Sequence, residues 1–186
     1  MKSMMTKNPL AFSLVELLVV VAMVGILLVV VTPAVTSISS NFQVTRQGQI
    51  MADNLVLTRQ MATTRNRDYE LMFFETPGAD PQWSFQLMEV GTNNSLKAAS
   101  RKYVFPEPVI LNKVLSPLVT GASTGVTNGA TWYALRFRPN GRLADRLDNA
   151  NNYLTIQLRN SKTNTPDNYY TLQINPVTGR VATYRP

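Results

Sequence analysis

The chain has 186 residues, of which 45% are hydrophobic and 16% charged, so it can bury a core and is not disordered in bulk. It contains no histidine and no cysteine. Their absence excludes histidine acid–base catalysis, nucleophile–histidine pairs, thiolate metal sites and disulfide bonds. The formal net charge is +7.

A hydrophobic segment near the N-terminus is the strongest local signal. The stretch from Phe12 to Val31 has the length of about 20 residues with which a helix spans a bilayer. Lys2 and Lys7 precede it, which places the N-terminus in the cytoplasm and the rest of the chain across the membrane. Hydropathy alone would fit a secretory signal peptide or a plain single-pass membrane anchor.

Glu16 does not fit these simple interpretations. A carboxylate in an apolar segment costs about 1–3 kcal/mol, and no cation follows it before Arg46. The residue is explained if a positive charge comes from another molecule, such as the free α-amino group of a neighbouring subunit. Between packed helices such a pair would set axial register more than stability.

Residues 11–16 read AFSLVE and are followed by the aliphatic run. This block resembles the class III signal of type IV pilins and type II secretion pseudopilins. The resemblance implies that prepilin peptidase cuts between Ala11 and Phe12, that Phe12 becomes N-methylated, and that Glu16 meets a neighbour's terminal amine. Ala11 stands where the family normally has glycine. Pro33 falls where many members carry a proline that kinks the helix.

The sequence after Pro33 predicts a continuation of the same helix, bent or loosened at the proline; the alternative is that Pro33 ends an anchor. Beyond it, apolar residues recur with helical spacing and form a stripe. The stripe consists of Val44, Met51, Leu55 and Ala62. Polar residues expected to face away from it are Gln43, Arg46, Gln47, Asn54 and Arg59. We expect the helix to run from Phe12 to about Arg65.

From residue 68 onward, apolar and polar residues alternate, which predicts half-buried antiparallel strands. The alternating runs are Tyr69–Phe74, Trp83–Met88, Tyr133–Arg138, Leu154–Arg159 and Tyr170–Asn175. Turns are expected at Asn140-Gly141 and at Asn175–Gly179, with a return strand at Arg180–Tyr184. The segment Thr120–Thr131, rich in glycine, threonine and serine, is expected to be a mobile loop.

The predicted fold class is therefore α+β and pilin-like. A long N-terminal helix, whose first half spans the membrane, packs on a small antiparallel β-sheet head. The expected divisions are a leader (1–11), an apolar transmembrane and assembly helix (12–35), an amphipathic helix continuing into the head (36–67) and a β-rich periplasmic head (68–186).

Two further motifs carry a second resemblance. Residues 137–142 read FRPNGR and residues 172–181 read LQINPVTGRV. Both are similar to the head of minor pseudopilin H and related minor pilins. The ending at residues 183–186 is also similar to the prepilin-like "Verru_Chthon cassette protein D" group.

Two possible chemical motifs have simpler explanations. Residues 121–125 match the G-x-S-x-G pattern of a nucleophile elbow around Ser123, which needs a preceding strand, a following helix and a histidine. A linker loop explains the pattern better, and a membrane-tethered hydrolase using Ser123 is a distant hypothesis. Asp145, Asp148 and Asn151 could line a calcium loop, but their spacing is not that of an EF-hand and favours a solvated turn.

The last third of the chain is rich in arginine, which binds phosphate through two parallel hydrogen bonds. These residues are Arg136, Arg138, Arg142, Arg146, Arg159, Arg180 and Arg185. One hypothesis is that the head of a minor pilin binds DNA, through Arg136, Arg138, Arg142 and Arg180. The alternative, which we favour, is a solubilising strand face.

Together these features predict a structural subunit, not an enzyme, with no cofactor and no metal. We expect a minor pilin or pseudopilin of a type IV pilus or type II secretion system. Its expected partners are prepilin peptidase, other pilins or pseudopilins and the bacterial inner membrane. Its N-terminus would be cytoplasmic and its head periplasmic, with later assembly into a pilus or pseudopilus. The alternatives are a DNA-binding minor pilin and a plain membrane-anchored protein.

Overall fold

The computed structural model describes residues 13–127, 129–144, 152–164 and 166–185, with the backbone alone for residues 30–40. Two compact units divide the chain between Ser39 and Ser40. The helix α1 (Leu14–Arg65) begins in the first unit and ends in the second. The leader and the expected cleavage site at Ala11 and Phe12 lie outside the described residues.

The backbone of α1 is helical through Pro33, so the alternative that this proline ends the helix is wrong. A proline removes one amide donor, and helix-compatible residues on both sides continue the hydrogen bonding. Within the described residues, no helix is both long and apolar enough to cross a membrane. The membrane-spanning segment expected at 12–35 stays a prediction.

In the second unit, α1 provides one side of the core. Val44, Met51, Leu55 and Ala62 have no exposed surface, which confirms the predicted stripe. Gln47, expected to face away, is only 3% exposed. It lies three residues after Val44 and four before Met51, so the helical repeat places it on the buried face.

Two antiparallel sheets make up the rest of the head. The larger has the order β3-β2-β1-β7-β6, with β4 also paired to β2. Its strands are β1 (Tyr69–Glu75), β2 (Trp83–Val90), β3 (Leu96–Ala98), β4 (Tyr103–Val104), β6 (Ser123–Thr127) and β7 (Ala130–Phe137). A short 3-10 helix (Thr92–Asn94) precedes β3, and the short helix α2 (Pro117–Thr120) precedes β6.

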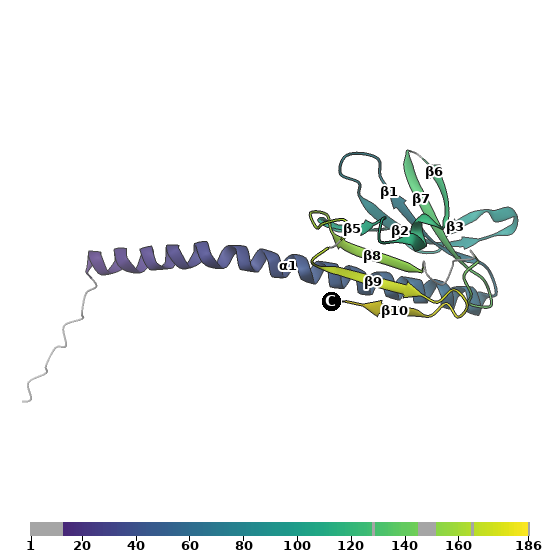
Figure 1. Ribbon diagram of the computed structural model, residues 1–186, viewed down its shortest axis with the longest axis horizontal. Helices are drawn as coiled ribbons and strands as arrows, with labels where there is room; N and C mark the ends of the chain where they lie inside the picture. Colours follow the sequence, from purple (N-terminus) through teal and green to yellow (C-terminus); the bar gives the residue numbers. More distant parts are fainter. Residues whose placement is uncertain (1–12, 128, 145–151, 165, 186) are drawn as a thin grey trace, which may run out of the picture. The chain divides into compact units, whose positions relative to one another are not determined.

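The smaller sheet has the order β10-β9-β8-β5. Its strands are β5 (Val109–Asn112), β8 (Tyr153–Leu158), β9 (Tyr169–Ile174) and β10 (Val181–Tyr184). In Figure 1, β9 and β10 lie along the C-terminal part of α1. At this contact a Cβ on Gly48 would overlap the ring of Tyr170, so the absence of a side chain lets the sheet approach the helix.

The strand registers place the apolar residues in rows across the larger sheet. Leu71 of β1 lies opposite Leu87 of β2 and Leu135 of β7, and all three have at most 1% exposure. These rows face the same core as the α1 stripe, together with Leu154, Ile156, Leu172 and Ile174 of the smaller sheet. The expected alternation of buried and less buried residues is confirmed in β9, whereas residues 69–73 of β1 and 154–157 of β8 are buried on both faces.

The segment Thr120–Thr131 is not the loop that its composition predicted. Residues Ser123–Thr127 form the edge strand β6, paired with β7. The hydroxyl of Thr124 donates a hydrogen bond to the backbone oxygen of Trp132, at 2.9 Å. Gly125 leaves room for the Trp132 ring, whose Cζ2 would lie 2.5 Å from a Cβ at that position. Threonine and valine favour strands, and this glycine reflects packing rather than mobility.

Candidate functional site: the apolar helix and the turns of the head

The first part of α1 presents aliphatic side chains in every direction around the helix. Between Leu14 and Val29 the large apolar side chains are 43% to 80% exposed. A helix that is hydrophobic all round requires apolar surroundings, either lipid or other helices. Within its own unit this segment has no covering element among the described residues.

Glu16 lies in the first turn of this helix and is exposed. A carboxylate there interacts favourably with the positive end of the helix dipole, by about 0.3–1 kcal/mol. Among the described residues Glu16 forms no ion pair: the four ion pairs all join residues between Arg67 and Arg159. Its charge is therefore available to a group from outside the described part of the chain.

Arg136 is not free to bind a ligand. The register of β1 and β7 places it directly opposite Glu70, and its Nε lies 2.5 Å from Glu70 Oε1. Its Nη1 also donates to Asn94 Oδ1 at 3.2 Å. The Glu70 side chain is only 6% exposed, so its charge requires this partner. The guanidinium of Arg136 therefore stabilises the sheet.

Arg138, Arg142 and Arg180 lie on two turns that contact each other. The first turn contains Gly141, whose φ is +76°, and the second contains Gly179, whose φ is +64°. The amide of Leu143 donates to the carbonyl of Pro176 across the two turns, at 3.0 Å. The motifs FRPNGR and LQINPVTGRV, far apart in sequence, therefore meet in the head.

Both turns also contact α1 through Arg59. A Cβ on Gly179 would lie 2.8 Å from Arg59 Cδ, and one on Gly141 would lie 3.2 Å from Arg59 Nε. The Arg59 Nε is buried and has no hydrogen-bond partner among the described residues. Arg59 was expected to face away from the apolar stripe, but its side chain lies half-buried against the two turns. Its only signal was its helical position, three residues before the buried Ala62.

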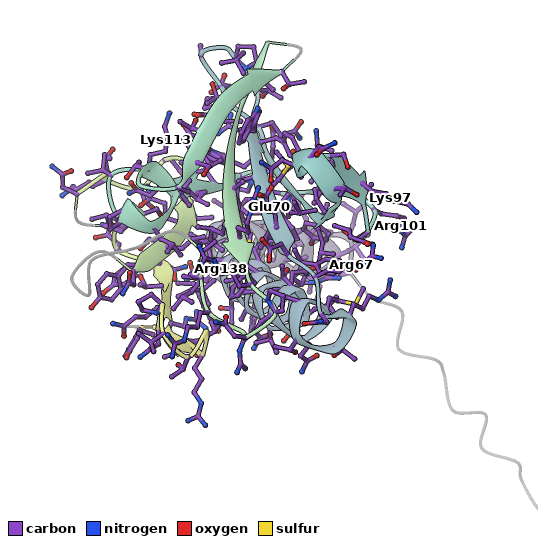
Figure 2. The ribbon with its side chains drawn as sticks, turned by 90° about the vertical axis from the view of Figure 1, so that its right-hand side faces the viewer. Arg67, Glu70, Lys97, Arg101, Lys113 and Arg138 are labelled. Carbon is purple, nitrogen blue, oxygen red and sulfur yellow. The ribbon has the colours of Figure 1, made fainter. Side chains whose placement is uncertain are left out.

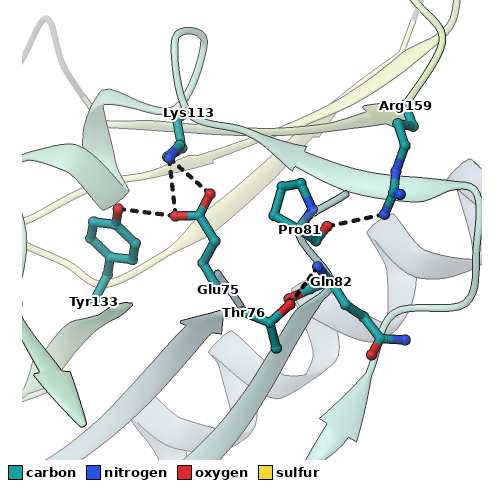
Figure 3. A network of polar contacts seen from close by, with 7 residues as sticks. All are labelled: Glu75, Thr76, Pro81, Gln82, Lys113, Tyr133 and Arg159. Atoms are coloured by element: carbon teal, nitrogen blue, oxygen red, sulfur yellow. Dashed lines mark hydrogen bonds and ion pairs between the residues drawn. The ribbon is translucent and has the colours of Figure 1, made fainter. Parts of the chain in front are cut away.

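A polar network connects the two sheets at the C-terminal end of β1 (Figure 3). Lys113, which follows β5, lies 2.8 Å from a carboxylate oxygen of Glu75, the last residue of β1. The hydroxyl of Tyr133 donates to the same carboxylate at 3.4 Å. Arg159, which follows β8, donates to the carbonyl of Pro81 at 3.0 Å and pairs with Asp80.

This network predicts a loss of stability at alkaline pH. The hydrogen bond to Glu75 raises the pKa of Lys113, and burial, followed by the Glu75 charge, raises the pKa of Tyr133. Both groups favour their protonated forms in the fold, so their contribution is complete below about pH 10 and is lost as the pH rises through the raised pKa values. Glu75→Gln should lower the free energy of unfolding at pH 7 by about 1 kcal/mol and flatten its decline above about pH 10.

The measurement is urea unfolding of the full chain at several pH values, followed by tryptophan fluorescence. The matched control is Asp80→Asn, which removes the carboxylate paired with Arg159 but keeps the contacts of Glu75 with Lys113 and Tyr133, so the alkaline decline should persist. An unchanged decline in Glu75→Gln would contradict the assignment.

The remaining candidates are dispersed or outside the described residues. Ser123 begins the edge strand β6 and is followed by more strand, not by the helix that a nucleophile elbow requires. Asp145, Arg146, Asp148 and Asn151 lie outside the described residues. Lys113 lies on the other side of the head from Lys97 and Arg101 (Figure 2), so these cations do not form one basic face. No group of metal-ligating side chains occurs in the part of the chain that the structure describes.

No protein-family model matches the sequence, and no curated protein matches it. Among solved structures, the minor pseudopilin EpsH of the Vibrio cholerae type 2 secretion system has 12% identity and a TM-score of 0.49, covering 77% of this chain and 98% of that one. The type IV minor pilin FimU of Pseudomonas aeruginosa has 18% identity and a TM-score of 0.48, covering 77% and 92%.

A second crystal form of FimU gives 17% identity and a TM-score of 0.45, covering 76% of this chain and 96% of that one. At these identities and TM-scores the likeness does not establish a family. The functional proposal rests instead on the chain's own residues: the apolar part of α1, its single carboxylate, and the joining of the same helix to the head core.

Proposed function

We propose that the chain is a pilin-like structural subunit that assembles side by side with similar subunits through the first part of α1. The observation that carries the proposal is the difference in exposure between the two parts of this helix. Between Leu14 and Val29 its aliphatic side chains are exposed all round, whereas its stripe from Val44 to Ala62 is completely buried in the head. The second part fixes the helix to a folded domain, and the first part is free to pack with other helices.

Packing of these helices supplies the driving force, because each buried aliphatic side chain contributes about 1.5–3 kcal/mol. Such packing is non-directional and tolerates sliding along the helix axis. Glu16 prevents this sliding by pairing with the N-terminal amine of a neighbouring subunit. A displaced register would leave both charges unpaired in apolar surroundings, at a cost of several kcal/mol.

Processing supplies the amine. In the proposal, prepilin peptidase removes the leader between Ala11 and Phe12 on the cytoplasmic side, and Phe12 is methylated. Before assembly the apolar segment resides in the inner membrane with the head in the periplasm. A methylated secondary amine remains cationic at neutral pH and can still pair with the carboxylate. Pro33 provides local flexibility in the helix where one hydrogen bond is missing.

The test is N-terminal mass spectrometry of the mature protein isolated from its native host. The proposal expects a mature chain that begins at methylated Phe12. A chain that begins after Val35 would mean an ordinary signal peptide, and an intact Met1 would mean a plain membrane anchor; either result would overturn the proposal. Both a type IV pilus and a type II secretion pseudopilus are compatible with it.

A further inference from the structure

The outer face of the smaller sheet contains a cavity of about 610 Å³, within the range of ligand sites in proteins. On β9, Tyr170 and Leu172 are buried, and Tyr170 contacts α1 at Gly48. Side chains alternate along a strand, so Tyr169 and Thr171 face the opposite side, where they line the cavity. The cavity thus lies on the face of the sheet turned away from α1.

The register of β8 and β9 determines the arrangement of the cavity floor. Thr155 lies directly opposite Thr171, and their hydroxyl oxygens are 3.0 Å apart. Tyr153 precedes Thr155 by two residues, and Tyr169 precedes Thr171 by two on the antiparallel partner. The tyrosines therefore lie at opposite ends of the threonine pair, separated along the strands by roughly 13 Å at about 3.4 Å per residue.

The walls are mainly apolar, and none of the described residues that line the cavity is charged. Val114 and Leu115 lie between β5 and α2, and Pro117 begins α2; Asn164 and Pro166, between β8 and β9, complete the lining. In a chain of net charge +7, a cavity without Asp, Glu, Lys or Arg indicates an uncharged ligand. Burial of apolar and aromatic surface would supply most of the affinity.

Besides the Asn164 amide, which can both donate and accept, the free polar groups in the cavity are hydroxyl donors. The Thr155 hydroxyl is occupied by the Leu115 carbonyl and by Thr171. Tyr153 accepts from Gln173 and so keeps its own proton, and Tyr169 has no hydrogen bond to another described residue. Two phenolic protons are therefore available at the ends of the floor. A ligand rich in carbonyl groups and poor in N–H groups would complement them.

We propose that this cavity binds an uncharged, proline-rich segment of a partner protein in the polyproline II conformation. Prolines in such a segment have carbonyl acceptors and no amide donors, and the free energy of ordering them is low. At 3.1 Å per residue, about four residues span the distance between the two tyrosines. An oligosaccharide fits less well, because its many hydroxyls would face the apolar wall without partners.

The experiment uses the full chain in phospholipid nanodiscs, in which no free detergent competes for an apolar site. The probe is a capped ten-residue polyproline peptide, titrated by isothermal calorimetry and by amide chemical shifts. We expect saturable binding with shifts at Leu115 and Thr171. Tyr169→Ala should weaken binding about tenfold, and Tyr169→Phe should weaken it less, because the ring remains and only the donor is lost.

The matched control is Val126→Ala on strand β6 of the larger sheet, whose side chain is exposed and does not line the cavity. It should leave binding unchanged, and thermal unfolding establishes that each variant is folded. Three results would overturn the proposal: no binding at several millimolar peptide, equal binding by wild type and Tyr169→Ala, or saturable binding of maltohexaose but not of the peptide. Failure here would leave the assembly proposal intact, because the cavity contains no residue of the apolar part of α1.

Discussion

Replacing Glu16 with alanine is expected to leave the chain correctly processed and folded but to abolish its incorporation into filaments. The side chain is exposed at the start of α1 and forms no ion pair with another described residue, so its loss does not disturb the head. In the assembled state its removal leaves a neighbour's terminal amine without a partner in apolar surroundings, at a cost of about 3–5 kcal/mol per subunit. That cost corresponds to a fall of about two to three and a half orders of magnitude in the equilibrium constant of each addition step.

The measurement compares the fraction of subunit in sheared filaments with the fraction left in membranes, alongside the N-terminal mass of each. Glu16→Gln separates charge from size and should fail in the same way as Glu16→Ala. The matched control is Asp53→Ala, which removes an exposed carboxylate from the part of α1 that belongs to the head, outside the apolar segment, and should assemble. Normal incorporation of Glu16→Ala would contradict the proposed pairing.

Replacing Gly179 with alanine is expected to destabilise the head by roughly 3 kcal/mol or more. Two costs combine at this position. The backbone φ of +64° disfavours any side chain by about 1–2 kcal/mol. In addition, the new Cβ would overlap the carbonyl of Gly141 and lie 2.8 Å from Arg59 Cδ, so two turns and a helix would have to separate.

Gly129→Ala is the matched control, because its φ of +77° is similar but the nearest atom to a Cβ is 3.9 Å away. It should cost only the backbone term, about 1 kcal/mol. Urea unfolding followed by fluorescence gives both values. If the two variants lost the same stability, the contact between the turns and Arg59 would contribute nothing.

Periodicity alone determined much of the head. The spacing of Val44, Met51, Leu55 and Ala62 predicted the buried face of α1, and the period-two runs predicted β1, β2, β7, β8 and β9, because burial of one face leaves a regular pattern in sequence. The prediction that Gln47 faces away from the core was wrong, because it relied on the polarity of the side chain and not on its position in the helical repeat. The sequence also predicted one small sheet, whereas the strands divide into two sheets, because strand order depends on contacts that periodicity does not encode.

The prediction of a loop in place of β6 was wrong because it relied on composition. Threonine, serine and glycine occur in loops and edge strands alike, and only the Trp132 ring over Gly125 distinguishes them here. The two arginine-containing motifs were recognised as turns, but their mutual contact and the position of Arg59 depend on tertiary packing. Likewise, the cavity between Tyr153 and Tyr169 follows from the register of β8 and β9, which the sequence does not specify. Glu16 was identified from sequence, and its pairing stays a prediction.

The contact between α1 and β9 has a consequence for biosynthesis. Gly48 of the helix packs on Tyr170, and the side-chain amide of Asn168 donates to that of Asn41 across 127 residues of sequence. The helix is therefore translated long before the strand that covers it. At a synthesis rate of about 5–20 residues per second, roughly 6 to 25 s pass between the synthesis of its apolar stripe and that of the strand. Over this interval the stripe has no strand of the smaller sheet to cover it, and its exposure on the nascent chain favours aggregation.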